Sequence, residues 1–175
     1  MNDFTSRQNW SKQCENQLNS QINLELFASH QYLYLSSHFD RDDIALKQLS
    51  DYYMKASIEE REHANLFIQY QNKRGGIVNL TNVNSPQILE DSANNSNYVI
   101  ESFKTALNLE KKVNNSLFEL HNIAGKNNDA QFSDFIEGTF LSEQVDGISE
   151  ISKYITQLEF IGDNKYGIWD FVKQL

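Results

Sequence analysis

Residues 49–70 read LSDYYMKASIEEREHANLFIQY, and the spacing of their apolar side chains predicts one long amphipathic helix. The face that would point into a core carries Leu49, Tyr53, Ala56, Phe67 and Tyr70. Glu60 and His63 are three residues apart and leave the helix on that same face. Burying a carboxylate and an imidazole is costly unless something pairs with them, and a metal ion is an effective partner. This stretch therefore predicts a core-facing helix that carries a metal-binding pair.

The remaining sequence predicts an all-α protein with four long helices and a short fifth one. We expect the helices at about residues 11–38, 43–73, 95–124, 130–160 and 168–172, with the Asp residues of 40–43 capping the second. The connection from Gly75 to about residue 94 is long and polar, and residues 77–80 within it have some strand character. Because adjacent antiparallel helices need only a few linking residues, this length predicts a crossover along a four-helix bundle, with helices two and three parallel.

Composition limits the classes of partner and location. The 175 residues suit a single domain, and 15 Lys and Arg against 24 Asp and Glu give a net charge of −9. An acidic chain argues against nucleic acid as a partner, and no apolar run approaches the roughly 18–20 residues of a membrane span. Residues 1–10 lack an apolar or Arg-rich leader pattern, and Cys14 is the single cysteine. We therefore expect a cytoplasmic protein.

Polar residues interrupt the apolar stripe of every long helix. Besides the pair on the second helix, these are Glu25 and Tyr32 on the first, Glu110 on the third and Gln144 on the fourth. Taken alone, each glutamate is more often a solvated boundary residue, and Tyr32 a packed core residue with a bonded hydroxyl group. Three carboxylates at one level of a core would repel one another, and two divalent ions would neutralise them. Oxygen ligands with one imidazole suit iron or manganese.

The chain resembles the ferritin family, of the eukaryotic heavy-chain type. The segments that carry the resemblance are 21–26, 39–43, 59–64, 109–114, 134–137 and 143–145. The resemblance implies that residues 1–175 form one ferritin-like domain with a non-haem di-iron centre. It implies that Glu25, Glu60 and His63 bind the first iron, that Glu60 bridges to a second iron on Glu110, and that Gln144 and Tyr32 lie close by. Glu59 would offer a transient further site.

The same resemblance implies a function. Ferritins oxidise Fe(II) with O2 at this centre and store the ferric mineral inside a hollow cage, so we expect a homo-24-mer or a cage shared with other ferritin subunits. Asp134 and Glu137 would line an iron entry channel, although an acidic, solvated first turn of a helix explains them equally well from the residues alone. Glu62 would nucleate mineral. Gln144 stands where bacterial di-iron relatives carry a second Glu-x-x-His, so the second iron should be held more weakly.

Three other functions fit parts of the pattern. A storage subunit without oxidation activity would need a broken centre, and a di-iron redox enzyme such as a peroxidase would favour a second Glu-x-x-His. A non-enzymatic helical interaction module would leave the polar residues on four inward stripes unexplained.

Overall fold

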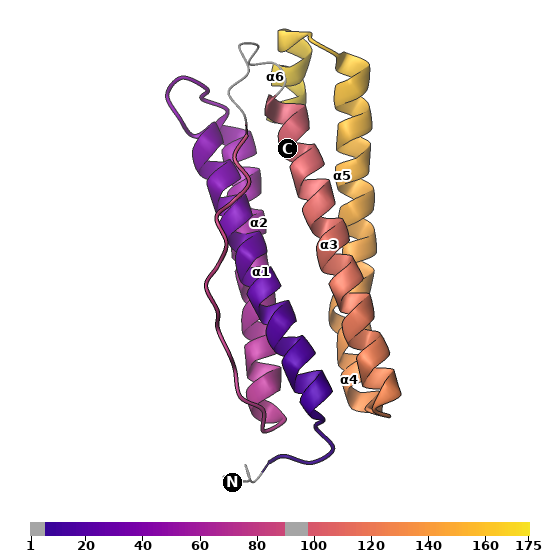
Figure 1. Cartoon of the computed structure of the whole chain (residues 1–175). Coiled ribbons are helices and arrows are strands. Elements are labelled where there is room, and N and C mark those ends of the chain that lie inside the picture. Colours follow the sequence, from indigo (N-terminus) through magenta and orange to yellow (C-terminus); the bar gives the residue numbers. More distant parts are fainter. Residues whose placement is uncertain (1–5, 90–97) are drawn as a thin grey trace.

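The computed structural model describes residues 6–89 and 98–175, and all the regular secondary structure within them is helical (Figure 1). The elements are α1 (Lys12–Phe39), α2 (Lys47–Lys73), α3 (Tyr98–Lys126), α4 (Ala130–Ile136), the π-helix η2 (Glu137–Leu141), α5 (Ser142–Ile161) and α6 (Lys165–Lys173). α1 packs on α2, α3 packs on α4 and α5, and the short α6 lies across one end. The predicted four-helix bundle with a short fifth helix is confirmed.

The long connection after α2 runs back along α1 to the opposite end of the bundle, so α2 and α3 are parallel (Figure 1). Amide side chains of α1 hold it: Asn19 Nδ2 donates to the carbonyl oxygen of Ile77 at 2.9 Å, and the Asn79 amide donates to Asn19 Oδ1 at 2.8 Å. Further along, the Gln87 amide donates to Gln31 Oε1 at 2.6 Å. The strand character predicted for residues 77–80 was wrong, because side chains rather than a neighbouring strand satisfy this backbone.

The start of the second helix differs from the prediction. α2 begins at Lys47, four residues later than predicted, because Ala45 adopts a φ of +53° and the Leu46 amide donates to the carbonyl oxygen of Phe39 at 3.0 Å. This tight turn occupies the segment that was expected to start the helix. The predicted capping by aspartate was also wrong, since Leu46 is the N-cap and makes no side-chain cap hydrogen bond. The predicted start of the third helix at residue 95 lies outside the described residues.

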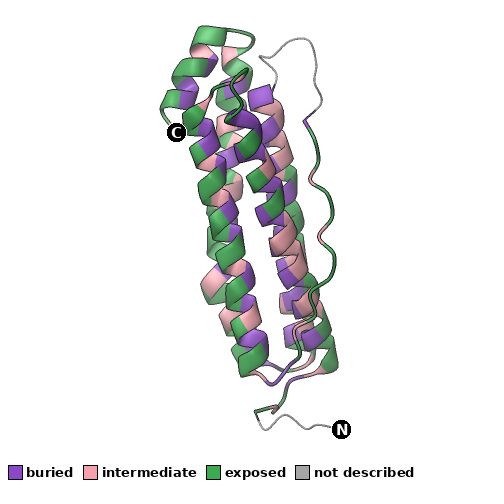
Figure 2. Ribbon diagram, turned by 90° about the vertical axis from the view of Figure 1, so that its left-hand side faces the viewer, coloured by how far each residue is buried: buried purple, intermediate pink, exposed green. Residues whose placement is uncertain are grey.

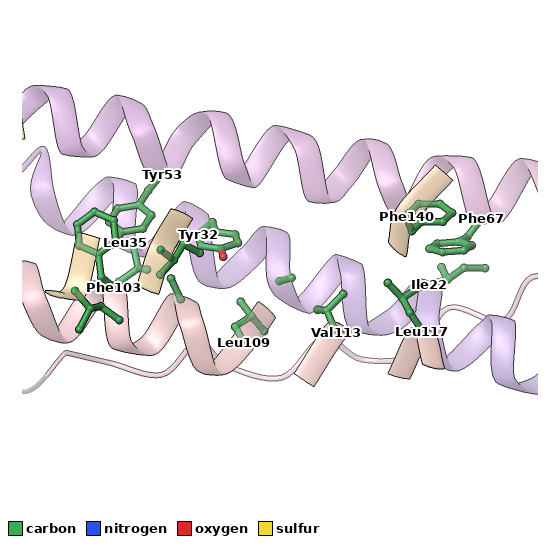
Figure 3. Close-up of a cluster of buried hydrophobic side chains, with 14 of the residues drawn as sticks. Ile22, Tyr32, Leu35, Tyr53, Phe67, Phe103, Leu109, Val113, Leu117 and Phe140 are labelled. Atoms are coloured by element: carbon green, nitrogen blue, oxygen red, sulfur yellow. The ribbon is translucent and has the colours of Figure 1, made fainter. Parts of the chain in front are cut away.

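The fourth predicted helix is not continuous. A π-helical turn, η2, separates α4 from α5, and such a turn accommodates an extra residue and changes the register of the helix after it. Phe140 in this turn stacks on Phe67 with ring centroids 4.1 Å apart, and its edge contacts the His63 ring at 5.5 Å. Figure 3 shows the Phe67 and Phe140 rings together in one part of the core. The interruption therefore lies beside a predicted metal ligand.

Buried side chains form stripes along the inner faces of the helices (Figure 2). On α1 this stripe includes Glu25 and Tyr32, as predicted, together with Ser29, and all three are buried. Leu33 lies off the stripe and is 41% exposed. Nearly complete burial of polar groups at successive turns is unusual and marks this part of α1 as part of a site.

Gly75 follows α2 in a conformation that excludes a side chain. Its φ is +70°, and an added Cβ would lie 2.7 Å from the backbone nitrogen of Arg7. We expect Gly75→Ala to destabilise the protein by more than about 1–2 kcal/mol, the cost of the left-handed conformation alone. Gly125→Ala is the matched control, because an added Cβ there meets no heavy atom within 4 Å. Equal urea midpoints for the two variants would contradict this prediction.

Candidate metal centre

Glu25 of α1 and Glu60 and His63 of α2 come together in the interior. One potential ligand atom from each lies within 4.8 Å of the other two. Glu25 is 0% and Glu60 4% exposed, and Gln21, one turn before Glu25, donates from Nε2 to Glu25 Oε1 at 2.7 Å. His63 Nδ1 lies 3.7 Å from Glu60 Oε2. Two carboxylates and an imidazole thus face one point from two helices.

Glu110 of α3 completes the interior set from the other side of the bundle. The Tyr32 hydroxyl group donates to its Oε1, and Gln144 of α5 donates from Nε2 to its Oε2 at 3.0 Å. Tyr32, Glu60, His63, Glu110 and Gln144 all line a cavity of about 650 Å³. Side chains predicted from four separate stripes therefore meet at one level of the bundle.

Several buried oxygen atoms at or beside this cavity lack a protein donor. Within the described part of the chain, Glu25 Oε2, Glu60 Oε2 and Gln144 Oε1 have no hydrogen-bond partner. A buried acceptor without a partner is costly, and three of them close together in one core would destabilise the fold. A divalent cation would satisfy these acceptors together, so the residues present fit a metal ion.

The pKa values of the interior carboxyl groups also indicate a site that fits metal ions. Burial, followed by the negative charge of Glu60, raises the pKa of Glu25 well above its usual range. Burial, followed by the charge of Glu110, raises the pKa of Glu60 to about 8, and burial raises the pKa of Glu110. Three carboxyl groups that resist ionisation together are a poor arrangement for an empty core and a good one for cations.

A second group lies at the mouth of the cavity. Ligand atoms of Glu59, His63 and Glu143 lie within 4.8 Å of one another, and His63 Nε2 is 3.4 Å from Glu143 Oε2. His63 therefore belongs to both groups. Sequence reasoning assigned no role to Glu143. Its position beside Gln144 could have revealed it. Glu59–Glu60 and Glu143–Gln144 are both pairs in which one residue faces the interior of the cavity and its neighbour faces the mouth.

The other predicted metal residues lie elsewhere. Asp134, Glu137 and Glu62 are exposed and belong to neither group. Glu137 instead forms an ion pair with His121, whose Nε2 lies 2.5 Å from Glu137 Oε1. Their roles in iron entry and nucleation remain predictions.

Metal binding should release protons in a pH-dependent way. At pH 7 Glu60 is mostly protonated, because its pKa of about 8 lies above that pH, and ligation requires the carboxylate. We expect Zn²⁺, used as a redox-inert probe, to bind with proton release at pH 7 and with less release above pH 8, and to bind more tightly as pH rises. Calorimetry in buffers of different protonation enthalpy measures this. An identical proton count for wild type and Glu60→Gln would contradict it.

A four-helix bundle that buries carboxylates, an imidazole and an amide around one cavity defines a class, the helical-bundle proteins with carboxylate-rich metal centres. Comparison with known proteins narrows the class. Residues 15–161 match the model of the ferritin-like domain. The chain is 44% identical over 170 residues to Ferritin-3, chloroplastic of Arabidopsis thaliana, and 45% identical over 156 residues to the ferritin heavy chain of Echinococcus granulosus. The chain therefore belongs to the ferritin family, whose members store iron.

The comparisons also correct one expectation. The Arabidopsis match covers 97% of this chain and 65% of that relative, so the chain spans about two thirds of its length, whereas the Echinococcus match covers 89% and 87%. The Arabidopsis relative and similar proteins of Vigna unguiculata and Glycine max are named chloroplastic. The predicted cytoplasmic location was therefore wrong. It rested on the sequence of residues 1–10 and on the single Cys14, which is buried in the core of α1 and so reports on packing rather than on a compartment.

Within the described residues, none of the helices combines the length and the apolar character that crossing a membrane requires.

Proposed function

We propose that this chain is an iron-storage subunit that oxidises its own substrate, Fe(II), with O2. The observation that carries the proposal is the set of buried acceptors without a partner on Glu25, Glu60 and Gln144, at the level where four helices meet. A purely structural core would leave these groups unsatisfied, and iron would satisfy them.

Each side chain has a role in this proposal. Glu25, Glu60 and His63 bind the first Fe(II), and Glu60 bridges to a second Fe(II) held by Glu110. Tyr32 and Gln144 position Glu110 through their hydrogen bonds to its two oxygen atoms. Bound iron supplies the electrons that reduce O2, and anionic oxygen ligands favour Fe(III) over Fe(II), which helps to drive the oxidation.

The two iron positions are unequal, and the inequality suits a storage protein. The first has two carboxylates and an imidazole, whereas the second has Glu110 and the neutral amide of Gln144 on its far side. Both positions share Glu60 and have one further carboxylate, so they differ in their neutral ligand. An amide oxygen binds a cation less tightly than an imidazole, so the second ion is released more readily. Glu59 and Glu143 at the mouth provide a transfer position, since they share His63 with the interior group.

Storage further requires many copies around a hollow space. We propose that residues 1–175 form one ferritin-like domain that assembles into a cage of 24 copies, with Asp134 and Glu137 at an entry channel and Glu62 on the mineral-bearing surface. In the single chain, large apolar side chains are exposed around α6: Phe160 is 94%, Tyr166 75% and Trp169 44% exposed. Such a group is typical of a surface that is covered in an assembly.

Aerobic iron loading followed by sizing tests the proposal. Light scattering of the native protein should give the mass of a large shell, and iron should elute with that shell after loading. A monomer or dimer, or iron that precipitates apart from the protein, would contradict storage.

A further inference from the structure

A row of tyrosine rings leads from the interior of the metal centre to its mouth. The rings of Tyr32 and Tyr53 stack with centroids 6.0 Å apart, and Figure 3 shows both in one part of the core. Tyr53 contacts Tyr52 edge-on at 5.2 Å, and Tyr52 contacts Tyr154 of α5 at 6.2 Å. Consecutive ring contacts of this length form a continuous path along which electrons can move in short steps.

The tyrosine hydroxyl groups along the row differ in whether a base can accept their proton when the ring loses an electron. Tyr32 donates to the Glu110 carboxylate, and at the far end Tyr154 donates to Glu150 Oε1 at 2.8 Å. Between them, Tyr53 donates to the hydroxyl group of Ser102 at 2.8 Å. A phenol loses an electron readily only when a base takes its proton at the same time, and a carboxylate is such a base whereas a serine hydroxyl group is not. A radical would therefore rest at Tyr32 or Tyr154 rather than at Tyr53.

The outer end is suited to exchange with solvent. Tyr154 is half-buried and Glu150 is exposed, and both line the cavity that contains Glu60, His63 and Glu110. Burial, followed by the interaction with Glu150, raises the pKa of Tyr154 to about 12, so the phenol keeps its proton at neutral pH until a base accepts it.

We propose that Tyr154 is a one-electron donor to the iron centre, with Glu150 as the proton acceptor and the rings of Tyr52, Tyr53 and Tyr32 as the path between them. The inference rests on the proposed function, which supplies the oxidant. Electron donation by Tyr154 would move one oxidising equivalent, left over from the reduction of O2, out of the core. It would then lie at a position that solvent can reach.

The electrons and protons of this step balance. Two Fe(II) ions give two electrons to O2, which takes two protons from solvent and becomes hydrogen peroxide. Reduction of the peroxide to two water molecules takes two more electrons and two more solvent protons. One further Fe(II) ion gives one electron and becomes Fe(III), and Tyr154 gives the other. Its phenolic proton passes to the Glu150 carboxylate, which leaves a neutral tyrosyl radical.

The test combines iron oxidation with detection of the radical. Assembled protein is mixed with air and a small excess of Fe(II) over the centres, Fe(III) is followed by absorbance, and samples frozen during the reaction are measured by electron paramagnetic resonance. A nitroso spin trap followed by peptide mass analysis identifies the residue. Tyr154→Phe keeps the ring, and Glu150→Gln keeps a hydrogen-bond acceptor but removes the base. Tyr166→Phe is the control, since Tyr166 is 75% exposed and its ring contacts Trp169.

We expect the wild type and Tyr166→Phe to give a radical trapped on the peptide that contains Tyr154, and the other two variants to lose it while they still oxidise iron. The same trapped radical yield in Glu150→Gln as in wild type, or the same resonance signal in Tyr154→Phe, would overturn the proposal. Iron oxidation by wild type without any radical would also overturn it and would leave the proposed function standing. Absence of iron oxidation in wild type would overturn both.

Discussion

Replacing Glu60 and His63 together by alanine should slow the oxidation of Fe(II) by at least about a hundredfold, because loss of groups that merely support metal ligands already costs 10–100-fold. Glu60 is the proposed bridge between both ions, and His63 belongs to both groups of potential ligands. Neither proposed iron position survives the change, so the remaining rate should approach that of buffer.

The matched control removes the same residue types from the surface. Glu119 and His30 are both exposed, so Glu119→Ala with His30→Ala should keep the wild-type rate. Stopped-flow absorbance of Fe(III) in air measures the rates, and circular dichroism checks that both double variants keep their helices. Equal oxidation by wild type and by Glu60→Ala with His63→Ala would contradict the proposed centre.

Asp129→Ala should cost about 3–5 kcal/mol of folding free energy, since it leaves a buried charge without its partner. Asp129 is 3% exposed and forms a bidentate pair with Arg74, whose Nη2 and Nη1 donate to Asp129 Oδ2 and Oδ1 at 2.6 and 3.1 Å. The guanidinium group also lies 4.7 Å from the centre of the Trp10 ring. In addition, the Asp129 carboxylate accepts from the Phe132 amide at 3.1 Å and so caps α4.

Two further variants separate these contributions. Asp129→Asn keeps the cap and removes the charge, so its loss should be intermediate. Arg74→Met combined with Asp129→Ala removes both charges and should recover part of the loss, because no unpaired guanidinium group remains. Urea denaturation measures each free energy of unfolding. Wild-type stability of Asp129→Ala would show that the pair contributes nothing.

The fold was largely predictable because the long helices carry apolar side chains at helical spacing. The interruption at η2 was not, since a π-helical turn depends on how Phe140 packs against Phe67 and His63, and these residues are distant in sequence. The extended segment at 77–80 was misjudged for a similar reason. Its backbone partners include the side chains of Glu15, Asn19 and Asn23, more than fifty residues away.

The interior of the site was predictable because a polar residue on an apolar stripe is conspicuous. Glu25, Glu60, His63 and Glu110 all stood out in this way. The structure brings the last three to one cavity and Glu25 beside Glu60 and His63, whereas their role as metal ligands remains a proposal. Glu143 did not stand out, because an exposed acid on a helix is ordinary until its distance to His63 is known.

Anomalous scattering at the iron edge, from crystals soaked anaerobically with Fe(II), locates bound metal most directly. We expect two peaks in the cavity about 3.5–4 Å apart, as in other two-metal sites. One should lie among Glu25, Glu60 and His63, and the other between Glu60 and Glu110. Absence of both peaks, or a single peak at the exposed Glu59 and Glu143, would contradict a two-iron centre in the interior of this bundle.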